Sequence, residues 1–194
     1  MMTKTLARLC AFTLCAALIS PLALALDLPK IKQSKLGLYL SAPEAAALLK
    51  AGPTKVLFID IRTRGEAQYV GYADQIDALV PYMEMTEFFD WDSSQNRFKL
   101  EVNPVFSQTI EKLLRAKGLT KTDKVVLICR SGDRSARAAD SLADAGFSKV
   151  YSVWDGFEGD MSPEGRRTVN GWKNAGLPWT YKLDRTKLWG PTQK

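Results

Sequence analysis

The chain has 194 residues, of which 46% are hydrophobic and 25% charged, with a formal net charge of +6 and no histidine. This length and composition are typical of one globular domain with its own core. The lack of histidine excludes Ser-His-Asp and Cys-His triads and the usual zinc sites, so a nucleophile must be activated without imidazole. The basic residues form no dense block, which argues against nucleic acid as a partner.

The first 25 residues have the pattern of a secretory signal peptide. Lys4 and Arg8 give a basic start, residues 9–22 are almost entirely apolar, and Ala-Leu-Ala at 23–25 places small residues two apart. The apolar run is short for a spanning helix and contains Ser-Pro, so cleavage is favoured over an uncleaved membrane anchor. The sequence therefore predicts a periplasmic or secreted protein with no stable membrane insertion after cleavage.

The rest of the chain is expected to form a leader, one domain and a tail. Residues 26–35 are interpreted as a polar, loosely ordered leader, residues 36–180 as the domain and residues 181–194 as a C-terminal tail. The mature chain would keep one cysteine, Cys129, because the other two lie in the signal peptide. It would then have no internal disulfide, no Cys-x-x-Cys pair and no cysteine metal cluster, and we expect neither metal nor cofactor.

Apolar strands alternate with helices along the domain. Ser41 and Glu44 have the spacing of a capping box at the first helix start. The pattern predicts strands at residues 36–40, 56–62, 76–80, 124–128 and 149–153. It predicts helices at residues 42–51, 63–70, 104–117, 136–146 and 164–174, with residues 81–103 the least regular portion. This alternation indicates an α/β fold with a mostly parallel sheet.

In such a sheet, functional sites form at the carboxyl ends of the strands. Asp60, Arg62, Cys129 and Trp154 are all predicted at that edge. The stretch 125–135 reads Val-Val-Leu-Ile-Cys-Arg-Ser-Gly-Asp-Arg-Ser and predicts a buried strand, a tight turn and a helix start. Main-chain amides of such a turn, the helix N-terminus and nearby arginines all favour the thiolate form of a cysteine.

Three stretches of the chain resemble the rhodanese sulfurtransferases. Residues 129–135 resemble the active-site loop of that family, Cys-Arg-x-Gly-x-Arg-Ser/Thr. Phe-Ile-Asp-Ile-Arg at 58–62, followed by Glu66, resembles its amino-terminal signature, and Trp-Asp-Gly-Phe at 154–157 with residues 171–178 resembles its carboxyl-terminal one. The resemblance implies a rhodanese-like three-layer fold, with helices on both faces of a central, mostly parallel sheet.

Two departures from the family pattern stand out. Gly-Tyr-Ala at 71–73 stands where the family often has Gly-His-Ile, so no histidine role carries over. Residues 158–169 look like an insertion, which could shape the pocket mouth or a docking surface.

What the resemblance implies is a persulfide relay. Cys129 would take a sulfane sulfur from a small sulfur-containing anion such as thiosulfate, or from a persulfide donor. It would pass that sulfur to a thiol or to cyanide. The resemblance does not decide whether a protein partner takes part. A relay of this kind needs no imidazole, and the lack of a second cysteine protects the persulfide from resolution into a disulfide.

The loop residues receive separate interpretations. Cys129 is the predicted nucleophile. Arg130 and Arg134 are expected to bind the anionic substrate, since a guanidinium can donate two hydrogen bonds to a tetrahedral anion. Gly132 is expected to permit the loop conformation. The remaining loop residues either contact substrate or brace the loop, namely Ser131, Asp133 and Ser135.

Residues outside the loop allow two interpretations each. Asp60 and Arg62 either brace the loop or touch substrate. Trp154 and Phe157 wall the pocket or, as we favour, pack in the core. An aromatic group could form a partner-docking patch but is expected in the core, namely Phe88, Phe89 and Trp91.

Two other functions compete with sulfur transfer. A thiol-dependent phosphatase or arsenate reductase also combines a cysteine, a loop of amides and an arginine, but places five residues between cysteine and arginine. Four residues lie between Cys129 and Arg134 here, which makes a smaller cradle. The second rival is a non-enzymatic sulfur carrier or binding module that works with a protein partner.

Overall fold

The computed structural model describes residues 27–190, and the predicted signal peptide lies outside them. Its centre is a five-stranded sheet in the order β1-β10-β9-β2-β4, in which all neighbours are parallel. The strands are β1 (Tyr39–Leu40), β2 (Val56–Asp60), β4 (Ala78–Leu79), β9 (Lys124–Ile128) and β10 (Val150–Val153). All five residues of β2 are buried, as expected for a strand covered on both faces.

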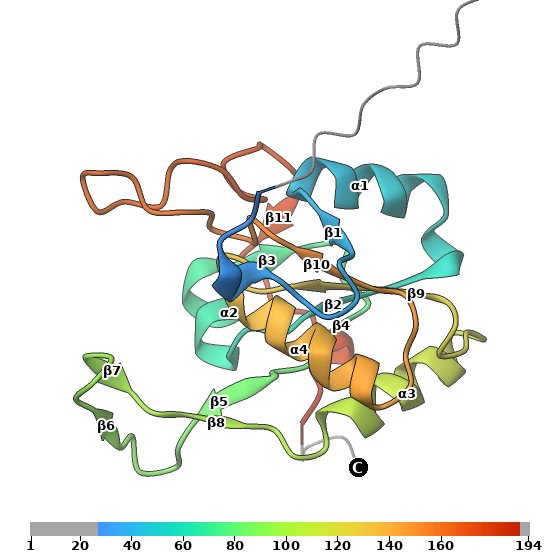
Figure 1. Ribbon diagram of the computed structural model, residues 1–194, viewed down its shortest axis with the longest axis horizontal. Helices are drawn as coiled ribbons and strands as arrows, with labels where there is room; N and C mark the ends of the chain where they lie inside the picture. Colours follow the sequence, from blue (N-terminus) through green and yellow to red (C-terminus); the bar gives the residue numbers. More distant parts are fainter. Residues whose placement is uncertain (1–26, 191–194) are drawn as a thin grey trace, which may run out of the picture.

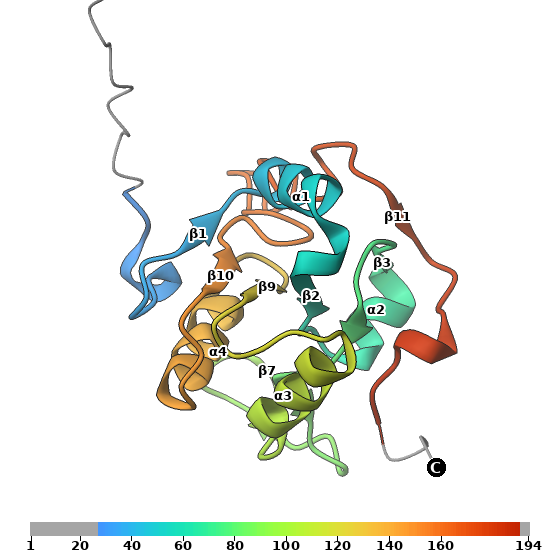
Figure 2. The ribbon, with the colours of Figure 1, turned by 90° about the vertical axis from the view of Figure 1, so that its right-hand side faces the viewer.

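Helices cover both faces of this sheet (Figures 1 and 2). The helices are α1 (Ala42–Ala51), α2 (Arg64–Val70), α3 (Phe106–Ala116) and α4 (Asp133–Asp144). Residues of α1 and α2 share one hydrophobic cluster with one face of β2 and β9, and residues of α3 and α4 share a second cluster with the other face. The predicted three-layer α/β architecture is therefore confirmed. Within residues 27–190, no helix combines the length and apolar character needed to cross a membrane.

The predicted start of α1 is confirmed in detail. Ser41 Oγ accepts from the Glu44 amide, and the Glu44 carboxylate accepts from the Ser41 amide at 2.7 Å. Thr63 and Glu66 make the same reciprocal cap at the start of α2. Both caps satisfy amides that the first helical turn leaves without partners.

The least regular portion of the sequence forms a long antiparallel hairpin. β5 (Met83–Met85) pairs with β8 (Leu100–Val102), and farther out β6 (Trp91–Asp92) pairs with β7 (Arg97–Phe98). The outer part projects from the body of the molecule (Figure 1). The aromatic group at its end is exposed, so the core interpretation was wrong: Phe88 is 84%, Phe89 57% and Trp91 51% exposed.

Two expectations about local order were wrong. Residues 164–174 form turns in place of a helix. Gly165 and Gly171 have φ of +76° and +96°, and a Cβ on Gly171 would lie 2.5 Å from the Gly159 nitrogen, so this segment is bent for close packing. The leader is also ordered: it contains a short 3-10 helix, Lys30–Lys32, and Lys32 Nζ lies 2.6 Å from Asp160 Oδ1.

The chain after residue 178 packs along the side of the molecule. β11 (Trp179–Thr180) pairs antiparallel with β3 (Tyr72–Ala73). A 3-10 helix, Arg185–Lys187, follows, and the Trp189 amide then donates to Leu79 O at 3.1 Å. The tail thus covers the free edge of β4, which would otherwise present unpaired backbone groups.

Candidate active site

The loop that carries Cys129 joins the end of β9 to the start of α4. Gly132 is the N-cap of α4 and has φ of +98°. A Cβ at this position would lie 2.0 Å from Trp154 O, and a Cβ on Gly156 would lie 2.5 Å from the Arg130 carbonyl carbon. The loop and the turn after β10 therefore pack backbone against backbone, and glycine is required on both sides.

Main-chain amides of this loop point at the sulfur. The amides of Gly132 and Ser135 donate to Cys129 Sγ at 3.1 and 3.4 Å. Both amides belong to the unpaired N-terminal end of α4, where the helix dipole adds positive potential. The thiol also lies 3.5 Å from Ser135 Oγ and 3.9 Å from Asp133 Oδ1. The arrangement can hold negative charge on this sulfur or on one bonded to it.

A second serine supports Ser135, and sequence reasoning missed it. Ser152 in β10 is fully buried, and its Oγ is 2.8 Å from Ser135 Oγ. Ser135 Oγ in turn donates to Gly132 O at 3.0 Å. This pair of hydroxyls ties the first turn of α4 to β10, and Ser135 Oγ is the one that lies 3.5 Å from the Cys129 sulfur. A lone polar residue inside the apolar strand 150–153 was the signal that could have revealed it.

Arg134 is held by an acidic partner. Its Nη1 and Nη2 donate to the two carboxylate oxygens of Glu66 at 2.8 and 2.5 Å. Burial raises the pKa of Glu66, but the hydrogen bonds and charge of Arg134, together with the Thr63 amide and Arg62, outweigh burial and lower this pKa to about 2. The Arg134 charge is therefore balanced inside the protein. The sequence shows Glu66 only as part of the amino-terminal signature, and this contact shows that Glu66 holds Arg134 in place.

Arg130 has a different environment. It is half-buried, and its Nε is buried without a hydrogen-bond partner among the described residues. Its carbonyl accepts from the amides of Glu158 and Gly159 at 3.0 and 3.3 Å, so the start of the 158–169 insertion packs on the loop. Ser131, beside it in the loop, is also half-buried.

Asp60 and Arg62 form a fully buried pair. Arg62 Nε and Nη2 donate to the Asp60 carboxylate at distances down to 2.6 Å, and Nη2 also donates to Gly71 O at 2.7 Å. The guanidinium lies 4.0 Å from the centre of the buried Phe157 ring. This pair braces β2 against neighbouring segments and does not line the pocket beside the Cys129 loop. Trp154 also does not line that pocket, and it contacts the loop through its carbonyl.

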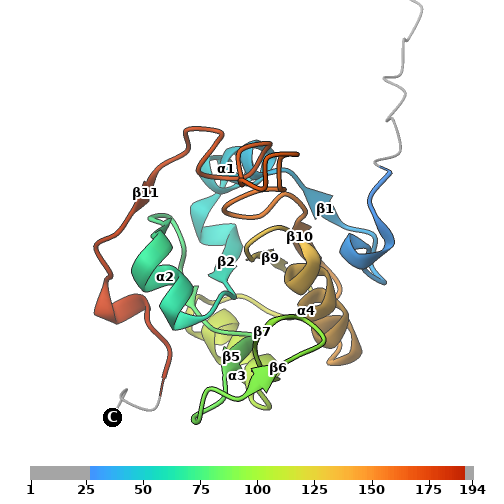
Figure 3. The same cartoon turned by 90° about the vertical axis from the view of Figure 1, so that its left-hand side faces the viewer.

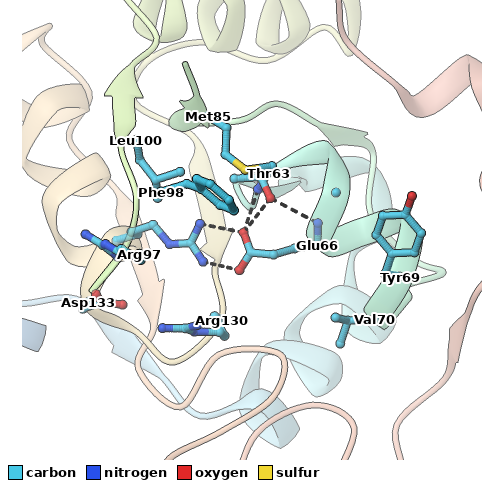
Figure 4. Close-up of a pocket in the computed structure, with 12 residues that line it drawn as sticks. Thr63, Glu66, Tyr69, Val70, Met85, Arg97, Phe98, Leu100, Arg130 and Asp133 are labelled. Atoms are coloured by element: carbon cyan, nitrogen blue, oxygen red, sulfur yellow. Dashed lines mark hydrogen bonds and ion pairs between the residues drawn. The ribbon is translucent and has the colours of Figure 1, made fainter. Parts of the chain in front are cut away.

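A cavity of about 390 Å³ lies beside the loop (Figure 4). One side comes from Arg130, Asp133 and Arg134, and the facing side from α2 residues such as Glu66. The hairpin completes the wall, and Figure 3 shows it on the side of the molecule where α2 and α4 face each other. Cys129 is fully buried and does not line the cavity. The Asp133 side chain lines the cavity and also approaches the sulfur.

The fold and this cysteine loop define a class of protein. Residues 41–162 match the family model described as the rhodanese-like domain. The chain belongs to the rhodanese-like family. Among residues 27–190, no group of histidine, cysteine, aspartate and glutamate side chains is placed to hold a metal ion.

The chain is also similar to several individual proteins. The uncharacterised protein RP600 of Rickettsia prowazekii is 28% identical over 126 residues, which are 63% of this chain and 81% of that protein. The crystal structure of Rv0390 from M. tuberculosis is 28% identical with a TM-score of 0.55, over 74% of this chain and 96% of that one. The solution structure of a polysulfide-sulfur transferase homodimer from Wolinella succinogenes matches at 20% identity and a TM-score of 0.40, over 81% of this chain and 82% of that one.

Proposed function

We propose that the protein is a sulfurtransferase that carries a sulfane sulfur on Cys129. The observation that carries this proposal is the pair of amides, from Gly132 and Ser135, aimed at Cys129 Sγ from 3.1 and 3.4 Å at the N-terminus of α4. Such donors stabilise an anionic sulfur without help from imidazole. Membership of the rhodanese-like family supports sulfur transfer in general, and the donor and acceptor are part of the proposal.

The reaction has two steps that leave the enzyme unchanged. The Cys129 thiolate attacks the outer sulfur of a donor such as thiosulfate, a new S–S bond forms, and sulfite leaves with the electron pair of the broken bond. An acceptor thiolate or cyanide then attacks the outer sulfur of the Cys129 persulfide, and the Cys129 thiolate leaves. The loop amides hold the charge that returns to Cys129 in the second step.

The burial of Cys129 adds a requirement to this mechanism. The side chain is 0% exposed, so a donor in the cavity does not touch the sulfur in the conformation described here. Asp133 is in reach of both, because it lines the cavity and its Oδ1 is 3.9 Å from the sulfur. Transfer therefore requires the Asp133 side chain or the loop to move aside, in the way that many enzymes gate access to a reactive group.

Intact-mass analysis after incubation with thiosulfate tests the proposal. The expected result is an adduct of one sulfur atom on Cys129 that cyanide removes, with thiocyanate as the product. Cys129→Ser should acquire no adduct. An unshifted mass in the wild-type protein, in buffer free of reducing agent, would count against sulfur transfer.

The rival functions are separated by two further measurements. A sulfur carrier would load sulfur from a partner protein but would not turn over a small donor such as thiosulfate. The burial of the Cys129 sulfur is the observation that favours a carrier. A phosphatase would hydrolyse an aryl phosphate, and here two of the Arg134 nitrogens that could bind a phosphate already donate to Glu66. Turnover of the phosphate ester without sulfur transfer would reverse our choice.

We further propose that the protein is exported and that residues 1–25 are removed. The support is the basic start, apolar run and Ala-Leu-Ala ending of this segment. N-terminal sequencing of protein from the periplasmic fraction should then begin at Leu26. Full-length protein confined to the cytoplasmic fraction would contradict export.

A further inference from the structure

The cavity beside the Cys129 loop is larger than an inorganic sulfur compound needs. It measures about 390 Å³, whereas a water molecule in the liquid takes up about 30 Å³. Cyanide or thiosulfate would occupy a small part of this space. Cavities of this size are typical of pockets that enclose organic ligands.

Much of the cavity wall is apolar. Two apolar side chains come from α2 and three from the hairpin, namely Tyr69, Val70, Met85, Phe98 and Leu100 (Figure 4). The ring of Phe98 also makes edge contacts with Phe89 and Trp91, at centroid distances of 5.8 and 5.5 Å. The hairpin thus presents an apolar surface to the cavity, a surface that small inorganic anions cannot use.

The charged part of the wall carries an excess of positive charge. Glu66 and Arg134 neutralise each other. Arg97, Arg130 and Asp133 also line the cavity, and none of the three forms a salt bridge among the described residues. Two positive charges against one negative charge leave one positive charge in the cavity. This balance complements a ligand with a single anionic group.

We propose that the sulfur is exchanged with an organic thiol that has an apolar body of several carbon atoms and an anionic group. This inference rests on the proposed function. The organic thiolate attacks the outer sulfur of the Cys129 persulfide, the new S–S bond makes an organic persulfide, and the Cys129 thiolate leaves. The reverse step, in which the organic persulfide donates, uses the same contacts. Phe98 and Arg97 are the specificity-determining residues, because the projecting hairpin brings both to the cavity.

Single-turnover discharge of the sulfur-loaded enzyme tests the inference. The probes are 3-mercaptopropionate, 6-mercaptohexanoate and 6-mercaptohexan-1-ol, which vary chain length and charge while the thiol stays the same. We expect 6-mercaptohexanoate to react at least about tenfold faster than 3-mercaptopropionate, because each methylene buried in an apolar site is worth about fourfold. It should also react about threefold or more faster than the neutral alcohol, since a surface charge contact contributes modestly.

Matched variants on the same hairpin assign the effect to particular side chains. Phe98→Ala should reduce the chain-length ratio at least about fivefold, whereas Phe88→Ala, which removes an aromatic side chain outside the cavity, should preserve it. Arg97→Gln should remove the preference for the carboxylate over the alcohol. Lys99→Gln, an exposed charge outside the cavity, should keep that preference. Ratios within each variant cancel any change in the reactivity of the persulfide itself.

The outcomes separate this inference from the proposed function. If thiosulfate loads the enzyme and cyanide unloads it, but chain length has no effect, the substrate class is wrong and sulfur transfer stands. If no sulfur loads, the proposed function fails first. Equal and slow discharge by all three thiols, together with fast discharge by an apolar cysteine-containing peptide, would show a protein-borne acceptor and overturn the inference.

Discussion

At the scale of single residues, the ion pair of Glu66 with Arg134 ties α2 to the start of α4 and should make stability depend on pH. The folded protein holds the Glu66 pKa at about 2, below its ordinary value of 4.5, because Arg134 outweighs the cost of burial. A lowered pKa adds stability that is fully present above about pH 4.5 and is lost as the pH falls toward 2. The full effect is about 3 kcal/mol.

Urea unfolding near neutral pH and near pH 3 measures this effect. Glu66→Gln should lower the free energy of unfolding at neutral pH, because it leaves Arg134 buried without its counter-ion. It should also flatten the decline toward acid. Glu111→Gln is the matched control, since Glu111 pairs with Arg115 and Lys121 at the surface. An equal flattening in both variants would contradict the role given to Glu66.

Gly132 provides a second test at this scale. Gly132→Ala should abolish sulfur loading on Cys129 and lower the free energy of unfolding by about 1–3 kcal/mol, because both its φ of +98° and the 2.0 Å approach to Trp154 O forbid a Cβ. Gly118→Ala is the control: Gly118 has φ of +74° with no atom within 4 Å of a Cβ. Mass analysis with thiosulfate and urea unfolding would measure both effects. Normal loading in Gly132→Ala would show that the amides need not hold this geometry.

At the scale of elements, the hairpin contributes to the cavity more than to the core. Met85 and Leu100 are paired residues at the base of the outer part, so an Asn-Gly turn can replace residues 86–99. We expect the free energy of unfolding to change by less than about 1 kcal/mol, since the aromatic side chains removed are largely exposed. Loading from thiosulfate should persist, and discrimination among thiols should disappear.

Thermal unfolding and the discharge assay together measure this replacement. A shortened protein that fails to fold would show that the hairpin belongs to the core. If the shortened protein keeps its preference among thiols, the α2 residues of the cavity wall determine that preference and the hairpin does not.

At the scale of the whole molecule, the C-terminal tail closes the sheet. Leu183 and Leu188 pack on one hydrophobic cluster and Trp189 on the other, and the Trp189 amide pairs with Leu79 of the edge strand β4. Removal of residues 182–194 should lower the free energy of unfolding by about 2–4 kcal/mol and promote self-association through the exposed edge.

Urea unfolding and size-exclusion chromatography measure these two consequences. Arg185→Ala is the control, because Arg185 is an exposed residue within the tail. A monomeric truncated protein of unchanged stability would show that β4 does not need this cover.

The sequence by itself determined the features that depend on near neighbours. The alternation of strands and helices, the cap of Ser41 with Glu44 and the amide-lined turn after Cys129 all follow from residues within a few positions of each other. Such signals survive without knowledge of the fold, because backbone hydrogen bonding and periodic burial act locally. The helix expected at 164–174 does not form, because the close packing of this segment against Gly159 outweighs its helical composition.

Only the tertiary structure decided which distant residues share the site. Glu66 forms an ion pair with Arg134, which is 68 positions away in the sequence. Ser152 in β10 contacts Ser135 in α4, and the hairpin brings Phe98 to the cavity. The exposure of the aromatic group and the burial of the Cys129 sulfur were decided in the same way. The physical reason is that burial and charge pairing depend on the folded arrangement of whole elements, and residue spacing along the chain does not contain that information.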